Sequence, residues 1–310
     1  MADEKKRWRV WLKRLAGVMG ISVVFLVFVA LPVFVSGQIT RVSTRPADAR
    51  MSSTPKDYSA PYRNVEFRAA DGVPLSGWRL DSREKQVTIV FAHGLARSRR
   101  ELLERAIDLW RLGYGVLLYD ARNHGESGPA RVTLGYDERL DVEGAVRFLR
   151  SDTQNTNHVA LYGVSMGAVA SLLAAAETPE AEAVIADSAY LNLTDTINHH
   201  VHLITRLPAF PLGAEFRILL EYRCGFDARK VDSLEAARRI GARPAMFIAG
   251  ANDPRMPPQI AEKLYEASTS PDRRLLINDG PGAEIHGHAY AADPQRYIRE
   301  VDEFLTTAFP

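Results

Sequence analysis

The stretch from residue 158 to residue 176 constrains the fold of this chain more than any other. An apolar run at 158–162 predicts a β-strand, and the alanine- and leucine-rich run at 168–176 predicts a helix. Between them lies Gly-Val-Ser-Met-Gly at 163–167, with a glycine two residues from Ser165 on either side. An ordinary glycine-rich turn is one interpretation. The flanking strand and helix favour a nucleophile elbow, a strained turn that exposes a serine hydroxyl.

Apolar runs alternate with helical patterns along the rest of the chain. Two short runs on either side of Ala70-Asp71-Gly72, at 65–68 and 75–80, predict a β-hairpin. The segments at 98–112 and 137–149 predict helices. Further runs predict strands at 87–92, 115–119, 159–162, 183–186, 245–249 and 274–277. This order predicts an α/β fold with a mainly parallel central sheet and helices on both faces.

Composition narrows the classes of partner. The chain has 310 residues, long enough for one large domain, and a formal net charge of +1, so nothing favours nucleic acid as a partner. Cys224 is the single cysteine, which excludes an internal disulfide framework and a multi-cysteine zinc site.

The amino terminus predicts a membrane anchor. Residues 1–14 are basic and precede an uncharged, mostly apolar segment whose core, 15–37, is long enough to cross a hydrocarbon layer of about 30 Å. Because positive charge before the span exceeds that after it, we expect a cytoplasmic N-terminus and an extracytoplasmic domain. The alternative is a secretory signal cleaved near Val35-Ser36-Gly37, which would release a secreted protein.

Segment boundaries follow from composition. Residues 38–61 are polar and rich in proline and serine, which is typical of a linker. The folded domain is expected at 62–310. Within it, residues 191–239 interrupt the alternation of strands and predict a small helical cap that sets substrate choice.

Polar side chains follow the predicted strands, where an open parallel sheet places its ligand site. These residues are His93, Asp120, Ser165, Asp187 and Asp253, with His286 beyond the last strand. Side chains from separate loops can therefore meet at one edge of the sheet.

Five segments together resemble the α/β-hydrolase family over residues 62–309. They are His93-Gly94, 120–127 (Asp-Ala-Arg-Asn-His-Gly-Glu-Ser), 163–167, 250–253 (Gly-Ala-Asn-Asp), and 286–290 with Asp293, Pro294 and Tyr297. The order serine, acid, histidine also matches that family. The resemblance implies the α/β-hydrolase fold and a serine hydrolase that uses no cofactor.

The chemistry of a serine nucleophile assigns the roles. A serine hydroxyl needs a base to accept its proton, and the base needs a carboxylate to hold its tautomer. We expect Ser165 to be the nucleophile, His286 the base and Asp253 the orienting acid. His288 stays open as the base and Asp187 as the acid. By resemblance, the backbone amides of Leu95 and Met166 form the oxyanion hole.

Other polar clusters have plainer interpretations. In this family, segments similar to 120–127 mainly shape a loop, so we assign no chemistry to His124. The histidines at 199, 200 and 202 lie on different sides of a predicted helix without a carboxylate or cysteine set, so no metal site is expected.

The expected function is hydrolysis of a carboxylic ester or related acyl bond through an acyl-enzyme. A small-molecule or lipid-like acyl substrate fits a site beside a membrane anchor. The same triad serves serine peptidases, thioesterases and acyltransferases, so these remain alternatives, together with a non-catalytic ligand-binding module.

Overall fold

A twisted eight-stranded sheet organises the domain within residues 1–152 and 158–310, which the computed structural model describes. The strands lie side by side in the order β1-β2-β4-β3-β5-β6-β7-β8. Their bounds are β1 (Arg63–Arg68), β2 (Pro74–Leu80), β3 (Val87–Ala92), β4 (Gly115–Tyr119), β5 (His158–Val164), β6 (Ala183–Asp187), β7 (Ala245–Gly250) and β8 (Arg273–Asn278).

Six of the strands in these ranges are parallel neighbours, from β4 through β3 to β8. β2 pairs antiparallel with β4, and β1 pairs antiparallel with β2. Val90 of β3 is paired with Leu117 on one side and Leu161 on the other. Every residue of β3 is buried, as expected for a central strand covered on both faces. The carboxyl ends of these strands therefore share one edge, where loops can bring distant side chains together.

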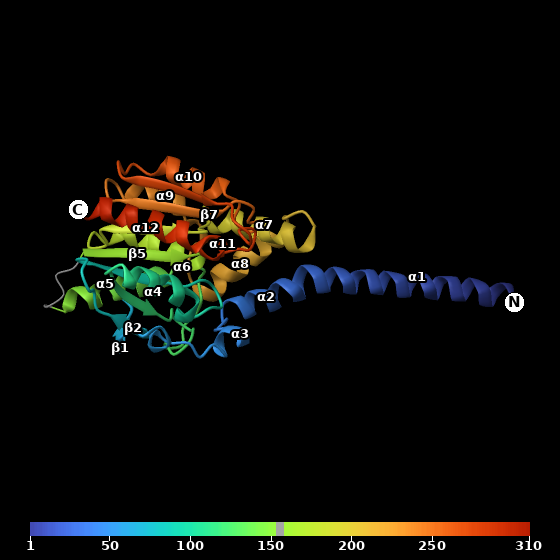
Figure 1. The fold of residues 1–310 in the computed structure, drawn as a ribbon. Helices are drawn as coiled ribbons and strands as arrows, with labels where there is room; N and C mark the ends of the chain where they lie inside the picture. Colours follow the sequence, from blue (N-terminus) through green and yellow to red (C-terminus); the bar gives the residue numbers. More distant parts are fainter. Residues whose placement is uncertain (153–157) are drawn as a thin grey trace.

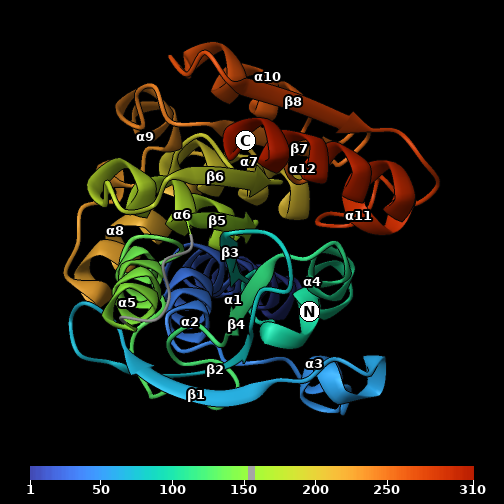
Figure 2. The ribbon, with the colours of Figure 1, turned by 60° about the vertical axis from the view of Figure 1, so that its left-hand side comes forward.

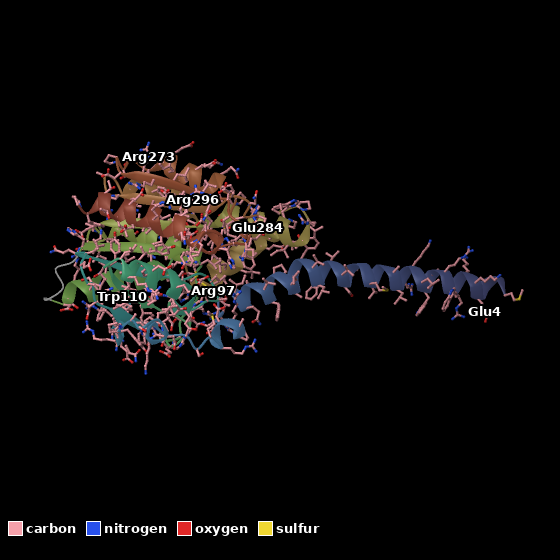
Figure 3. The ribbon with its side chains drawn as sticks, viewed as in Figure 1. Glu4, Arg97, Trp110, Arg273, Glu284 and Arg296 are labelled. Carbon is pink, nitrogen blue, oxygen red and sulfur yellow. The ribbon has the colours of Figure 1, made fainter. Side chains whose placement is uncertain are left out.

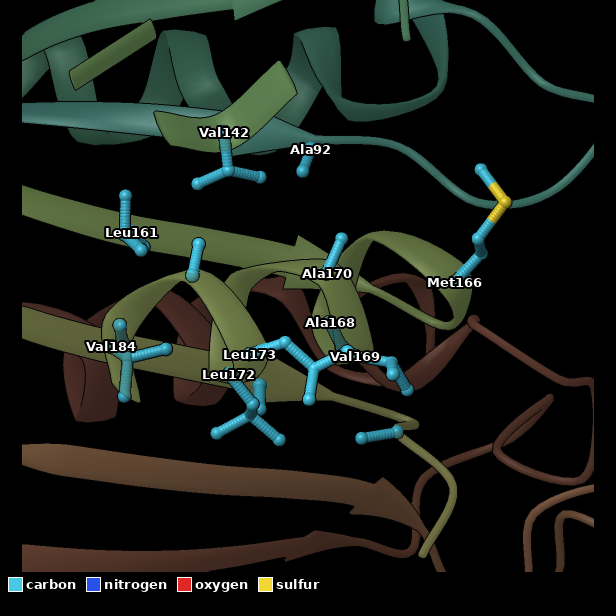
Figure 4. Close-up of a cluster of buried hydrophobic side chains, with 14 of the residues drawn as sticks. Ala92, Val142, Leu161, Met166, Ala168, Val169, Ala170, Leu172, Leu173 and Val184 are labelled. Carbon is cyan, nitrogen blue, oxygen red and sulfur yellow. The ribbon is translucent and has the colours of Figure 1, made fainter. Parts of the chain in front are cut away.

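Helices cover both faces of the sheet, as Figure 2 shows. One face carries α5 (Glu138–Ser151), α6 (Met166–Glu177), α9 (Ser233–Arg239) and α10 (Gln259–Ala267); the other carries α4 (Leu103–Arg111), α11 (Ala289–Ala292) and α12 (Pro294–Ala308). Figure 4 shows Val169 and Leu172 of α6 among Leu161 of β5, Val184 of β6 and Val142 of α5. The predicted α/β fold is confirmed.

One helix differs from its predicted bounds. The segment 98–112 begins with a 3₁₀ turn, η3 (Arg99–Leu102), before α4 starts at Leu103. The Arg99 amide donates to the carboxylate of Asp120 at 2.8 Å, so a side chain beyond the next strand holds this entrance to the helix. That contact has no local sequence signal.

The cap consists of α7 (Leu193–Thr205) and α8 (Leu212–Cys224), followed by η4 (Ala228–Lys230). Both helices lie over the carboxyl edge of the sheet, at the end of the domain that the N-terminal helix reaches (Figure 1). The α9 helix lies in the range predicted for the cap but packs on α6 instead.

The N-terminal segment is one long helix with a π-helical turn, made of α1 (Ala2–Phe25), η1 (Leu26–Ala30) and α2 (Leu31–Ile39). Residues Glu4–Ile39 are long and apolar enough to cross a membrane, by length and composition. Most of this helix projects away from the domain, with Glu4 near its far end (Figure 3). Its last part, α2, packs against the cap, on α8.

The segment after the helix is folded onto the domain. It contains α3 (Pro46–Ala49) and η2 (Pro55–Tyr58). The Arg45 amide donates to the Ala96 carbonyl at 2.9 Å, and the Thr44 hydroxyl to the Arg97 carbonyl at 2.8 Å. Residues predicted as a linker thus make specific contacts with a loop beside β3.

Candidate active site

Ser165 stands on a strained turn between β5 and α6. Its φ is 54° and its ψ is −117°, a conformation that costs a non-glycine residue energy. The Ser165 amide donates to the Asp187 carbonyl at 2.9 Å, which fixes the turn to β6. A Cβ atom on Gly163 would lie 2.1 Å from the Gly167 carbonyl oxygen, and one on Gly167 would lie 2.1 Å from that of Ala92. Both glycines are therefore required by close backbone approach.

The structure brings Ser165, His286 and Asp253 together in one hydrogen-bonded chain. His286 Nε2 lies 2.8 Å from Ser165 Oγ, and His286 Nδ1 lies 2.6 Å from Asp253 Oδ2. The other carboxylate oxygen, Asp253 Oδ1, accepts the amides of Arg255 at 2.8 Å and Met256 at 3.1 Å. Because both oxygens are engaged, the carboxylate has one orientation toward the imidazole.

The two open alternatives lie elsewhere. His288 is exposed at the start of α11, and in the described part of the chain its ring bonds neither Ser165 nor Asp253. Asp187 is fully buried and is engaged by Arg105, Tyr297 and Ser188. The geometry favours His286 as base and Asp253 as its partner.

Asp187 belongs to a buried polar network that lies next to the triad and includes Arg105 and Tyr297. Tyr297 Oη donates to Asp187 Oδ2 at 2.8 Å, and Arg105 Nη1 lies 3.3 Å from the same oxygen. Arg105 Nη2 also donates to the carbonyl of Gly287 at 3.4 Å, next to His286. The network therefore positions the histidine loop against β6, whose Asp187 carbonyl accepts the Ser165 amide. Sequence reasoning missed Arg105, since nothing in its helical context signals a polar contact.

The loop after β3 leaves one amide free between two engaged ones. Gly94 N donates to Glu101 Oε2 at 2.7 Å, and Ala96 N donates to His124 Nε2 at 3.1 Å. Between them, Leu95 N has no acceptor among the described residues. Met166 is the first residue of α6, so its amide has no acceptor one turn earlier in that helix. Leu95 and Met166 line the same cavity as Ser165.

Residues 120–127 build the loop beneath these amides. His93 Nε2 accepts the Ala121 amide at 2.9 Å, and His124 Nδ1 lies 2.8 Å from the Arg122 carbonyl. Burial lowers the pKa of His124 to about 4, so the ring is neutral near pH 7 and its Nε2 can accept from Ala96. The loop thus holds the free amide in place, consistent with a structural role.

His124 predicts a pH-dependent stability. Its folded-state pKa of about 4 lies below the ordinary value of 6.5, so its contribution is full above pH 6.5 and is lost as pH falls toward 4. The loss is at most about 3 kcal/mol. We expect His124→Gln, whose side-chain oxygen can accept from Ala96, to flatten the decline in unfolding free energy between pH 7 and pH 4.5. Denaturant unfolding at both pH values measures this, and an unchanged slope in the variant contradicts the assignment.

An apolar cavity of about 400 Å³ opens at Ser165. Its walls come from the cap, from the loop after β3, from the acid loop and from α2, and its apolar lining includes Leu95, Met166, Ile197, Leu212, Phe216 and Met256. His200 and Arg255 also line it, and the sequence analysis assigned neither of them to the active site. Burial lowers the pKa of His200, whose Nε2 lies 3.4 Å from Arg255 Nε. Arg255 lies two residues after Asp253 in the sequence. Its closeness to the predicted acid was a signal that it could lie near the site.

The histidines of α7 bind protein groups. His199 Nε2 lies 2.8 Å from the Pro254 carbonyl, which ties the cap to the acid loop, and His202 Nδ1 lies 3.1 Å from the Leu207 carbonyl. Over residues 1–152 and 158–310, no group of three or more His, Cys, Asp or Glu side chains is placed to hold a metal ion.

Comparison with known proteins gives three kinds of match. Residues 83–214 match the model of the family described as serine aminopeptidase, S33. The uncharacterized protein YqkD of Bacillus subtilis strain 168 is 29% identical over 76% of this chain and 77% of its own length. The uncharacterized membrane protein YNL320W of Saccharomyces cerevisiae is 22% identical over 72% of this chain and 74% of its own.

Among solved structures, the Pyrococcus furiosus esterase Pf2001 superposes with a TM-score of 0.72 and 26% identity, covering 87% of this chain and 99% of the esterase. The sheet order, the serine turn and these matches show the α/β-hydrolase fold, and the chain is similar to members of the α/β-hydrolase family. Its activity class is that of a hydrolase.

Proposed function

We propose that the chain is a serine hydrolase that cleaves carboxylic esters through an acyl-enzyme intermediate. The observation that carries this proposal is the chain of short contacts from Ser165 through His286 to Asp253, at 2.8 Å and 2.6 Å, at the base of an apolar cavity. The distances lie within the range that proton transfer from a serine to a histidine requires. An esterase among the similar structures agrees with it.

In the first half of the reaction, Ser165 Oγ attacks the ester carbonyl carbon while its proton passes to His286 Nε2. The new Oγ–C bond forms a tetrahedral oxyanion, and Asp253 stabilises the imidazolium through Nδ1–H. The amides of Leu95 and Met166 would donate hydrogen bonds to the oxyanion, and the positive end of the α6 dipole would stabilise its negative charge further.

Collapse of this intermediate breaks the bond between the carbonyl carbon and the alkoxy oxygen. His286 returns the proton to the departing alkoxide, which leaves as the alcohol. Water then attacks the acyl-enzyme, again giving its proton to His286, and the carboxylic acid is released with Ser165 regenerated. Every step uses groups of the chain and water, without a cofactor.

An aminopeptidase is the second candidate, because the matched family model carries that description. Such an enzyme binds a protonated α-amino group, and a buried cation needs a carboxylate partner. None of the residues that line the cavity in the described part of the chain is Asp or Glu, and Arg255 adds a positive charge. The lining therefore favours an apolar acyl group over an amino-terminal residue.

A profile across bond types tests the proposal. We expect p-nitrophenyl esters to be hydrolysed at least about tenfold faster, as kcat/KM, than amino-acid p-nitroanilides of matched size. Thioesters of the same acyl chains separate a thioesterase from an ester hydrolase. Faster anilide hydrolysis would favour the aminopeptidase. No turnover of any class by folded protein would favour a ligand-binding module.

The N-terminal helix supports a second part of the proposal, which is location. We propose that it is an uncleaved anchor, with residues 1–14 in the cytoplasm and the hydrolase domain outside. The basic residues before the apolar segment support this orientation, and a relative described as a membrane protein supports the anchor. Protease digestion of intact cells tests it, since a domain that survives while a surface control is degraded contradicts it.

A further inference from the structure

The end of the membrane helix forms one wall of the cavity at Ser165. Four side chains of α2 line the cavity, and they are Leu31, Pro32, Val35 and Ile39. Their spacing places them on one face of the helix. The facing wall belongs to the cap, with Ile197 and Val201 from α7 and Leu212 and Phe216 from α8. The anchor is thus part of the substrate cavity as well as an attachment to the membrane.

Specific contacts fix α2 in this position. Arg223 of α8 donates to Ser36 Oγ at 3.0 Å and to the Val33 carbonyl at 3.0 Å. Ser36 and Thr40 are fully buried, and the Thr40 carbonyl accepts the Val132 amide at 3.1 Å. A helix that only tethered the domain would not need polar partners at its own backbone.

The segment that follows α2 contacts the two residues after Leu95, Ala96 and Arg97. Thr44 and Arg45 donate hydrogen bonds to the carbonyls of Arg97 and Ala96 in the loop after β3. Arg97 Nε also lies 3.0 Å from the buried Asp48 carboxylate. Arg97 lies close to where the helix meets the domain (Figure 3). The anchor and its extension therefore border the site on two sides.

The proposed anchor would place the cavity at the depth of the bilayer surface. A hydrocarbon core of ~30 Å takes about 20 helical residues, which reaches from Leu15 to about Phe34. The cavity-lining face of α2 spans this boundary, since Leu31 lies before it and Ile39 after it. A hydrophobic path therefore leads from the outer leaflet along α2 to Ser165.

The tip of the cap is suited to the same surface. The loop between α7 and α8 lies on the side of the domain from which α1 extends (Figure 1). This loop and the last turn of α7 carry exposed apolar side chains, with Ile204 of α7 76% exposed and Leu207 and Phe210 of the loop 44% and 81% exposed. Apolar side chains at this level of the helix can be buried by lipid rather than by water.

We propose that the substrate is a long-chain acyl ester of a membrane amphiphile, whose acyl chain enters the cavity from the outer leaflet between α2 and the cap. This inference rests on the proposed ester hydrolase function. Val35, in the middle of the lining face of α2, then determines acyl-chain length. The polar part of the ester stays at the bilayer surface, where Arg255 lines the cavity and is exposed.

Val35→Trp, measured in full-length protein reconstituted into phosphatidylcholine vesicles, tests the inference. The readout is the ratio of kcat/KM for p-nitrophenyl dodecanoate to that for p-nitrophenyl acetate. We expect the bulky side chain to lower this ratio about tenfold, the loss expected when about two methylene groups are no longer buried. Val33→Trp is the matched control, because Val33 is 41% exposed on the same helix and does not line the cavity. It should keep the wild-type ratio.

Val35→Ala is a second test, which holds even if the protein does not fold with tryptophan at position 35. The smaller side chain should raise the ratio of hexadecanoate to dodecanoate hydrolysis. Wild-type ratios in both Val35 variants, or an equal loss in Val33→Trp, would overturn the inference while acetate hydrolysis persists. Absence of acetate hydrolysis in the wild-type chain would instead overturn the proposed function, and this inference with it.

Discussion

Replacement of Ser165 by alanine should lower kcat/KM for a p-nitrophenyl ester by about 10⁴-fold or more, because no other group can form the acyl-enzyme. Alanine fits the turn as well as serine does, since the space around Cβ is unchanged and the strained φ of 54° is already carried by a non-glycine residue. The loss should therefore appear in activity and leave the unfolding midpoint near its wild-type value. Steady-state hydrolysis and denaturant unfolding measure the two quantities.

Ser171 offers a matched control for this substitution. It lies on α6, the helix that Ser165 precedes as the N-cap residue, and its buried hydroxyl has no hydrogen-bond partner among the described residues. Ser171→Ala removes the same kind of atom, a serine hydroxyl oxygen, from a nearby position and should leave kcat/KM within about twofold of wild type. Comparable activity in Ser165→Ala and Ser171→Ala would remove Ser165 from the mechanism.

Asp253→Asn should lower kcat by about 10³- to 10⁴-fold. The backbone amides of Arg255 and Met256 donate to Oδ1 of this side chain. They would select the asparagine orientation that accepts from them, which turns the amide NH₂ toward His286 Nδ1. The ring would then have to carry its proton on Nε2, facing Ser165, and could no longer accept the proton of the hydroxyl. The defect is one of tautomer, with the fold intact.

The comparison that checks this assignment is Asp187→Asn, because Asp187 is the other acid that the sequence left open. Removing its charge weakens the Arg105 and Tyr297 contacts and should reduce stability more than it reduces turnover. Activity is best counted per active site titrated with a fluorophosphonate. A larger loss of turnover per site in Asp187→Asn than in Asp253→Asn would reverse the roles.

Most of the sheet could be predicted from sequence because each strand carries its own local signal. The run 87–92 is apolar at nearly every position, as a central parallel strand must be, and all of β3 is buried. The candidate site could be predicted for a related reason. Ser165 directly follows β5, Asp253 lies three residues after the end of β7, and His286 lies on the loop after β8, so parallel strands bring them to one edge. The choice of His286 over His288 as the base could be made only from the hydrogen bonds in the structure.

Contacts between distant segments could not be predicted in this way. The composition of 15–37 and 38–61 is that of an anchor and a linker whether or not these segments pack on the domain. Arg223 lies 187 residues after Ser36, and no local pattern connects them. The polar network around Arg105 could not be predicted for the same reason, since a buried arginine and an exposed arginine look alike in a helical sequence.

The central claim is that Ser165 becomes acylated, and mass spectrometry of the quenched reaction tests it most directly. Full-length protein mixed with excess p-nitrophenyl dodecanoate and acid-quenched in the first turnovers should carry one dodecanoyl group, mapped by peptide analysis to Ser165. Ser165→Ala should carry none. Turnover without any adduct on Ser165, or an adduct that persists in Ser165→Ala, would contradict the account.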